Sequence, residues 1–374
     1  MFRVGILKAL QPVKYGLQRA AYLSSWNGHR NEILQEIYAP FSKLVKDSPE
    51  YEALAESGTV WEDYFQPGDS ERYGYVELQK ASLYLPLLKE IDNQRASLWT
   101  PRSRMFHSLI PEYAHQSVFI ENNRLLLKHS CLMNKRLKNA VPDLALPAGN
   151  LSQIALPDMH YLLPDEDPSQ VAELRNHILA SRWVTDVALR STNSGLSEDE
   201  IRCLSALLLR NTTGEKLYNS GWGRKVALGD YRQAPIQAKS SPLTIFPYHL
   251  EVPACMRRFI HWRDRVTREE RLHPLIVACH ATVYFLHIHP FLDGNGRVSR
   301  LLMQDYMIRH GYPPVVIRDL NREEYVRMIR SAQEGDPEEL VYTVLTTQLE
   351  QLKRFGLPRS AMSEPEYLRL FHRH

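Results

Sequence analysis

The chain has 374 residues, of which 44% are hydrophobic and 24% are charged. This composition is typical of a globular protein and argues against a disordered or fibrous chain. The 46 basic and 43 acidic residues leave a formal charge of only +3, too small for a protein that binds nucleic acid through a basic surface. At about 150 residues per domain, the length predicts two to three domains.

The four cysteines are widely spaced and form no C-x-x-C pair: Cys131, Cys203, Cys255 and Cys279. This spacing argues against a disulfide framework and against a thiolate zinc site, so we expect a reducing compartment. No segment reaches the roughly 18–20 apolar residues of a membrane helix. We therefore expect an intracellular protein without a membrane span, cytoplasmic or nuclear.

Residues 1–30 contain no acid but carry five basic residues, Arg3, Lys8, Lys14, Arg19 and Arg30. An acid-free basic leader is typical of a mitochondrial presequence. However, the early basic residues do not gather on one helical face, and Pro12 interrupts the stretch. A targeting segment and an ordinary basic arm are both open readings of residues 1–30.

Residues 31–139 have a helical pattern. Within them, leucines at helical spacing predict a helix over 74–91, which Pro86 is expected to kink or divide. The following region, 140–168, contains five prolines and is predicted to be a connector without a long helix. Helical pattern returns over 172–189. Ser197 and Glu200 then form a capping box that predicts the start of another helix.

Residues 229–248 differ from their surroundings and predict a short β-hairpin in an otherwise helical protein. A helix is expected from about Pro253. His273-Pro274 opens the next helix, which should end near Ile288 because a residue before proline disfavours helical geometry. A further helix is expected over 297–310, and Gly311 stops it. Residues 169–352 form the predicted core, and 353–374 a basic tail.

The loop His-Pro-Phe-Leu-Asp-Gly-Asn-Gly-Arg-Val-Ser-Arg at 289–300 carries the chemistry. Two glycines before a helix expose backbone N–H groups along one surface, which makes a site for phosphate. Arg297 and Arg300 are three residues apart and share a helix face, where guanidinium groups can hold phosphate oxygens. Asp293 beside a phosphate needs a bridging cation such as Mg²⁺. His289 is placed to accept a hydroxyl proton.

The whole string resembles the signature of the Fic family of nucleotidyl transferases, His-Pro-Phe-x-(Asp/Glu)-Gly-Asn-Gly-Arg-x-x-Arg, at every specified position. The resemblance extends from about 172 to 352 and includes Tyr231-Arg232 and Gly311-Tyr312-Pro313-Pro314. It implies a mostly α fold, namely a Fic helical core with a short β-hairpin flap, preceded by a helical domain. It also implies a protein adenylyltransferase that moves AMP from ATP to a Ser, Thr or Tyr hydroxyl of a target protein.

The resemblance implies a role for each residue of the loop. Gly294, Asn295 and Gly296 would hold the α- and β-phosphates of ATP. Arg297 would bind the β-phosphate region and Arg300 the γ-phosphate. Asp293 would ligate Mg²⁺, with Mn²⁺ as an alternative, and His289 would be the base.

The resemblance also implies a flap and an adenine pocket. Ile236, Gln237, Ala238 and Lys239 would line the nucleotide site and align the target segment by strand addition. Pro235 beside this edge departs from the usual flap and leaves the register open. Tyr325 would lie near the adenine, while Val326 and Gln333 depart from the residues of relatives.

Residues 117–122, Ser-Val-Phe-Ile-Glu-Asn, fit the inhibitory pattern (Ser/Thr)-x-x-x-Glu-(Gly/Asn) of the family. By that resemblance, Ser117 begins the motif and Glu121 would pair with Arg300, occupying the guanidinium that the γ-phosphate requires. The expected function is autoinhibited AMP transfer. Removal of AMP from a modified protein and a silent interaction module are the alternatives. The target protein and the oligomeric state, a homodimer included, stay open.

Overall fold

The computed structural model of the chain describes residues 35–61, 70–142, 151, 154–219, 226–236, 246–333 and 335–356. Within these ranges the regular structure is helical and contains no strand, so the predicted mostly α fold is confirmed. The elements are α3 (Ala39–Ser42), α4 (Pro49–Ser57), α6 (Ser70–Ala96), α7 (Arg102–Phe119), α8 (Leu127–Ala140), the 3₁₀ helix η1 (His160–Leu162), α10 (Pro168–Arg190), α11 (Glu198–Leu209), α12 (Thr213–Asn219), α13 (Val252–Glu269), α14 (Pro274–Ile288), α15 (Asn295–Arg309), α16 (Arg322–Gln333) and α17 (Glu338–Gly356).

The predicted β-hairpin falls largely on residues 237–245, which lie outside the described residues, as do Gln237, Ala238 and Lys239. Ile236 is described; it is partly buried and belongs to no helix. The basic segment 1–30 and the tail from residue 357 also lie outside the described ranges. None of the helices that the structure describes combines the length and hydropathy that a bilayer-spanning segment requires.

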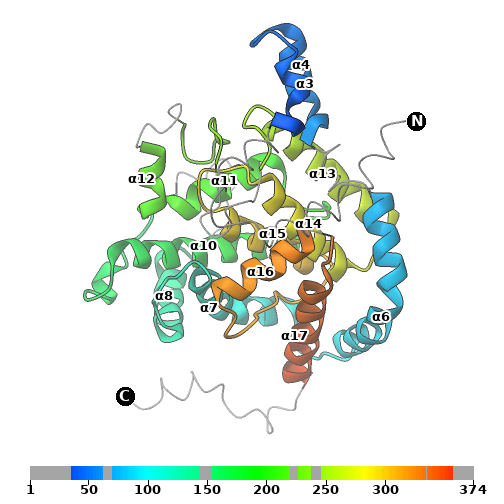
Figure 1. Ribbon diagram of the computed structural model, residues 1–374. Helices are drawn as coiled ribbons and strands as arrows, with labels where there is room; N and C mark the ends of the chain where they lie inside the picture. Colours follow the sequence, from blue (N-terminus) through cyan, green and yellow to red (C-terminus); the bar gives the residue numbers. More distant parts are fainter. Residues whose placement is uncertain are drawn as a thin grey trace.

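The centre of the molecule is α14, whose residues 275–288 are all buried. A helix that is apolar on every side must be surrounded, and α14 packs against α13, α15, α16 and α17. Figure 1 shows α14 and α15 in the middle of the molecule, with α7, α8 and α10 on one side of them and α6 and α13 on the other. The loop between α14 and α15 therefore starts and ends on the most deeply packed helices.

The helices before residue 140 share the hydrophobic core of the helices after residue 168. Helix α10 packs against both α7 and α15, and one cluster of buried side chains runs from Ile37 to Leu352. This packing brings the C-terminal end of α7 and the residues that follow it, which together carry the sequence 117–122, next to the first turns of α15.

Local sequence signals set several helix ends. The Ser197 hydroxyl accepts a hydrogen bond from the Glu200 N–H at 3.3 Å, and Glu200 Oε2 accepts one from the Ser197 N–H at 2.7 Å, as the capping box predicted. Pro274 occupies the first turn of α14. Pro86 does not divide the predicted helix, because α6 continues through it from Ser70 to Ala96. Because Pro86 is exposed, water can replace the hydrogen-bond donor that the proline lacks.

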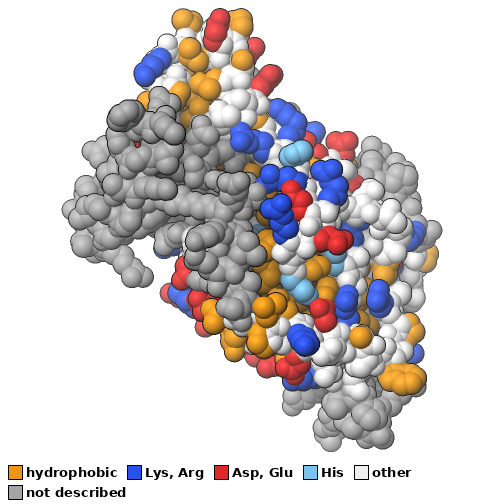
Figure 2. Space-filling view, turned by 90° about the vertical axis from the view of Figure 1, so that its right-hand side faces the viewer, with side chains coloured by type: hydrophobic (Ala, Val, Ile, Leu, Met, Phe, Trp, Pro, Cys, Tyr) orange, Lys and Arg blue, Asp and Glu red, His pale blue; other side chains and the backbone are white. Residues whose placement is uncertain are grey.

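A segment formed by α3 and α4 projects from the body near α13 (Figures 1 and 2). Its attachment is aromatic and polar: the Tyr38 ring stacks on Tyr248, and Trp61 is completely buried. Arg257 and Arg258 of α13 donate hydrogen bonds to backbone carbonyls at the end of α4. Basic side chains accordingly lie directly below the projecting segment in the space-filling view (Figure 2).

The aromatic packing between α13 and α14 gives a test of the core. Phe259 is fully buried and contacts Tyr284 and Phe285 edge to face. Phe259→Ala should lower the free energy of unfolding by about 3–5 kcal/mol because it leaves a cavity. The matched control is Tyr342→Ala on α17, where an exposed ring should contribute about 0.5 kcal/mol or less. Urea unfolding measures both, and equal losses would contradict the assignment of α13 and α14 to the core.

Candidate active site

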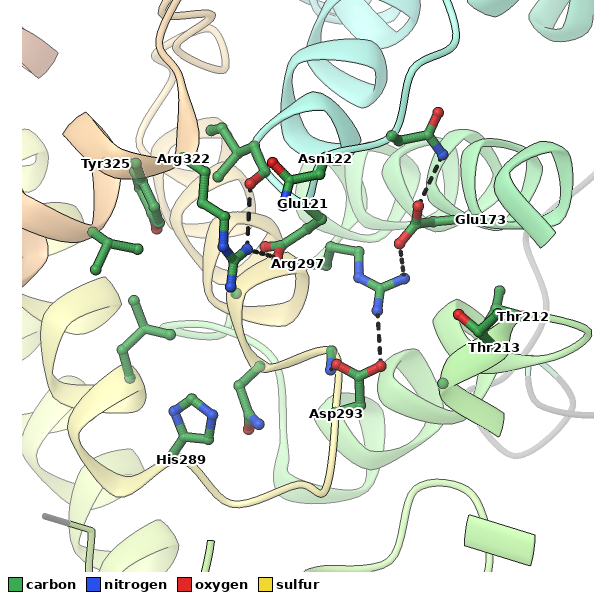
Figure 3. Close-up of a pocket in the computed structure, with 18 of the residues that line it drawn as sticks. Glu121, Asn122, Glu173, Thr212, Thr213, His289, Asp293, Arg297, Arg322 and Tyr325 are labelled. Atoms are coloured by element: carbon green, nitrogen blue, oxygen red, sulfur yellow. Dashed lines mark hydrogen bonds and ion pairs between the residues drawn. The ribbon is translucent and has the colours of Figure 1, made fainter. Parts of the chain in front are cut away.

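A cavity of about 900 Å³ opens over the first turn of α15. Five segments that are distant from one another in the sequence form its walls (Figure 3). They are the end of α7, the start of α10, α12, the α14–α15 loop and α16. The side chains that line it include Glu121, Glu173, His289, Asp293, Arg297 and Tyr325. Apart from Arg300, the residues that the sequence analysis assigned to a phosphate site therefore share one cavity with the predicted inhibitory glutamate.

The α14–α15 loop is held in a defined shape by its own polar groups. The Asn295 side chain donates to the Phe291 carbonyl at 2.8 Å and accepts from the Phe291 N–H at 3.0 Å. Gly294 has φ of +80°, a left-handed conformation that suits glycine, and it precedes α15 as N-cap. The first N–H groups of a helix have no intrahelical acceptor, and here they belong to Asn295, Gly296 and Arg297. They form an anion site at the edge of the cavity.

His289 ends α14 in a left-handed conformation, with φ of +51°. Its carbonyl accepts a hydrogen bond from Nε of Arg232 at 2.8 Å. The same buried guanidinium donates to the carbonyls of Pro247 and Ala234, which stand on either side of residues 237–245. Arg232 thus fixes the backbone of His289 and links it to the two flanks of the predicted flap.

The imidazole of His289 is neutral at physiological pH. Burial lowers the pKa of His289 to about 3, and the positive charge of Arg232 acts in the same direction. The Phe246 ring packs against the imidazole, with the ring centroids 4.2 Å apart. A neutral imidazole that faces the cavity can accept a proton.

Asp293 presents one carboxylate to the cavity. Its Oδ1 accepts the Gly294 N–H at 2.7 Å, and its Oδ2 lies 3.6 Å from Nη2 of Arg297. Gly214 of α12 makes room for it, since a Cβ there would lie 2.4 Å from Oδ2. Across the described residues, no three His, Cys, Asp or Glu side chains converge on a metal site. A single carboxylate beside a phosphate site fits Mg²⁺, which takes its other ligands from phosphate and water.

Arg300 is held by the segment that the sequence analysis singled out at 117–122. Its Nη2 lies 2.7 Å from Glu121 Oε1 and donates to the Ser117 carbonyl at 2.8 Å. Its Nε donates to the Ser117 hydroxyl at 2.7 Å. The structure therefore brings together Ser117, Glu121 and Arg300, as the motif predicted.

The Glu121 carboxylate also stands directly over the anion site. A Cβ built on Gly296 would lie 2.5 Å from Glu121 Oε1 and 3.2 Å from Arg300 Nη1. Arg322 of α16 pairs with the other oxygen of Glu121. Burial by itself would raise the pKa of Glu121, but Arg300, Arg297 and Arg322 outweigh it and lower the pKa to about 2. Glu121 is therefore ionised at physiological pH.

Arg297 is engaged by a residue that the sequence analysis missed. Glu173 of α10 lies 2.7 Å from Arg297 Nη1, opposite Asp293 (Figure 3). Burial raises the pKa of Glu173, while Arg297 and a hydrogen bond from Asn123 act against that rise. The sequence did offer one signal for Glu173: it is an acid among the buried positions of the predicted helix 172–189. Arg322 and Arg232 were also missed as site residues.

The far end of the cavity is formed by α16. Tyr325 lies there with Val326 and Gln333, the three positions that the sequence analysis connected with adenine. The guanidinium of Arg300 lies over the Tyr325 ring, 5.1 Å from its centroid. Ile236 is not among the residues that line this cavity.

Comparison with known sequences gives matches over the site. The Fic/DOC family model matches residues 195–307. The protein adenylyltransferases Fic of Drosophila grimshawi and Drosophila mojavensis are each 47% identical over 81 residues, 22% of this chain. The aligned residues span only 17% and 16% of the length of those relatives.

Solved structures extend the likeness in fold. Fic-1 of C. elegans has a TM-score of 0.55 at 18% identity, covering 93% of this chain and 97% of that chain. A Fic domain containing signaling protein from Bacteroides thetaiotaomicron has a TM-score of 0.54 at 19% identity, covering 72% of this chain and 95% of that chain. At such identities these likenesses concern the fold alone.

Proposed function

We propose that residues 195–307, which match the Fic/DOC family model, form a Fic domain, and that the chain is a protein adenylyltransferase that moves AMP from ATP to a hydroxyl of a target protein. The observation that carries the proposal is the shared cavity: a neutral His289, the free N–H groups of the first turn of α15 and Arg297 all border it. The names of the relatives, protein adenylyltransferase Fic, support the same reaction.

In the proposed reaction, the N–H groups of Gly296 and Arg297 and the side chain of Arg297 bind the ATP phosphates. His289 takes the proton of a Ser, Thr or Tyr hydroxyl, and the oxygen forms a bond to the α-phosphorus. The bond between the α-phosphorus and the bridging oxygen breaks, and pyrophosphate leaves. Such a displacement depends on positioning and charge neutralisation, which this cavity supplies.

A divalent cation belongs to this proposal. Asp293 would hold Mg²⁺, which would supply positive charge to offset that of the phosphates. We also propose that the target protein docks along residues 236–239. This docking would depend on main-chain rather than side-chain contacts.

We further propose that the enzyme is autoinhibited by Glu121. The carboxylate pairs with Arg300 and stands within the space above Gly296, so it excludes a phosphate by both volume and charge. Because the pKa of Glu121 is lowered to about 2, protonation at physiological pH does not release Arg300.

The same cavity supports a second candidate reaction, removal of AMP from a modified protein. Glu121 is an ionised carboxylate on the wall of the cavity that His289 borders, where it can orient a water molecule. The two reactions differ in their need for Glu121: transfer is hindered by this carboxylate, whereas hydrolysis requires it.

The first prediction for this function concerns Glu121. Glu121→Gly should raise AMP transfer from labelled ATP and lower any hydrolysis of an AMP-modified protein. Adding Arg300→Ala should cancel the gain, since that guanidinium is the group which the first substitution exposes. A double-mutant cycle on self-modification rates measures the coupling. Equal transfer by wild type and Glu121→Gly would contradict the inhibitory role and leave the transferase proposal standing.

The second prediction concerns His289. In a Glu121→Gly background, His289→Ala should lower the transfer rate by about 10²–10⁴-fold and leave ATP affinity nearly unchanged. Because burial lowers the pKa of His289, the neutral base persists in mildly acidic solution. Transfer should therefore change less than about twofold between pH 8 and pH 6, whereas a histidine with a pKa of about 6.5 would lose roughly three quarters of its neutral form. A rate profile with half-loss near pH 6.5 would contradict this account.

A further inference from the structure

Arg297 is fixed between two carboxylates that come from different elements. Its Nη1 lies 2.7 Å from Glu173 Oε1 of α10, and its Nη2 lies 3.6 Å from Asp293 Oδ2 of the α14–α15 loop. The Arg297 side chain is only 5% exposed and that of Glu173 16%. The contact is an ion pair between two largely buried side chains, and their mutual attraction restrains the guanidinium.

The carboxylate of Glu173 is also held by a hydrogen bond from Asn123. Its second carboxylate oxygen accepts a hydrogen bond from Asn123 Nδ2 at 2.8 Å, and Asn123 Nδ2 also donates to the Gln170 carbonyl at 3.0 Å. The side-chain oxygen Oδ1 of Asn123 accepts the Leu125 N–H at 3.0 Å. A series of polar contacts therefore connects Asn123 to Glu173 and Glu173 to Arg297. Asn123 lies two residues after Glu121.

Glu173 and Glu121 differ in their position relative to the anion site. A Cβ on Gly296 would collide with Glu121, whereas Glu173 is not among the atoms nearest to Gly294 or Gly296. Arg297 Nη2 lies 3.8 Å from the Cβ position of Gly294. Glu173 therefore pairs with Arg297 on the wall of the same cavity without entering the space over Gly296 that Glu121 occupies.

We propose that Glu173 is a positioning residue for AMP transfer, which acts by holding the Arg297 guanidinium beside the anion site. This inference rests on the transferase function proposed above. An arginine aimed by a carboxylate can stabilise charge on the leaving pyrophosphate at the moment it develops, whereas a free arginine must first be ordered. The two glutamates therefore have opposite effects on transfer: Glu121 hinders it and Glu173 supports it.

The test uses the full chain carrying Glu121→Gly, with AMP transfer to itself from labelled ATP as the readout. Adding Glu173→Gln, which keeps the shape and removes the charge, should lower kcat/KM for ATP about tenfold. The matched control is Glu323→Gln, an exposed acid at the start of α16, which should change it less than about twofold. Transfer that is unchanged or faster with Glu173→Gln would overturn the proposal.

A second arm separates positioning from a general structural role. Because Glu173 acts through Arg297, Glu173→Gln should have no further effect once Arg297→Ala is present, and the two variants should agree within about twofold. A further loss in that background would mean that Glu173 supports the site by another route, and would overturn the proposal. Thermal unfolding of each variant accompanies the rates.

Two outcomes keep this inference distinct from the function on which it rests. If Glu121→Gly neither binds ATP nor transfers AMP, the transferase proposal itself fails. If Glu173→Gln does not fold, Asn123→Ala replaces it: this change removes the donor to Glu173 and keeps the charge, and it should lower kcat/KM in the same direction by a smaller factor. Unchanged transfer by Asn123→Ala would then count against the proposal.

Discussion

The ion pair between Glu121 and Arg300 is the interaction on which the rest of the site depends. It joins the residues that follow α7 to the first turns of α15; α7 contacts α15 directly, and α10 packs against both helices. Two further contacts hold α7 in place: the Tyr113 hydroxyl donates to the Arg300 carbonyl, and the Gln116 amide donates to the Leu320 carbonyl. The position of Glu121 is therefore set by helix packing rather than by the ion pair alone.

The charged side chains around the first turn of α15 pair with one another. Arg297 pairs with Glu173 and Asp293, whereas Arg300 and Arg322 both pair with Glu121. Buried charges need partners, so a site built to bind phosphates must satisfy its own cations while it is empty. In our account the three acids do this in different ways. Glu121 takes the place of a phosphate, Glu173 positions the guanidinium of Arg297, and Asp293 is available to bind a cation.

Much of this arrangement could be predicted from the sequence because its signals are local. Ser197 and Glu200 predicted the start of α11, and the loop 289–297 is contiguous, so its geometry follows from neighbouring residues. Pro168 was assigned to the connector, yet it occupies the first turn of α10, a position that proline also favours. A proline alone does not say on which side of a helix boundary it lies.

Other parts could not be predicted because tertiary packing creates them. Glu173 and Arg297 are 124 positions apart by number, and neither a period nor a spacing connects them (297 minus 173). The same is true of Arg322 beside Glu121 and of Arg232 beneath His289. Glu121 and Arg300 are even farther apart in sequence, by 179 positions, but the family resemblance of residues 117–122 supplied the link that residue chemistry did not.

The most direct test of the central claim is a measurement of ATP affinity rather than of turnover. Isothermal titration of the full chain with Mg-ATP should give at least about tenfold tighter binding for Glu121→Gly than for wild type, because the substitution frees Arg300 and the space over Gly296. Equal affinities for the two proteins would contradict the claim that Glu121 occupies the place of a phosphate.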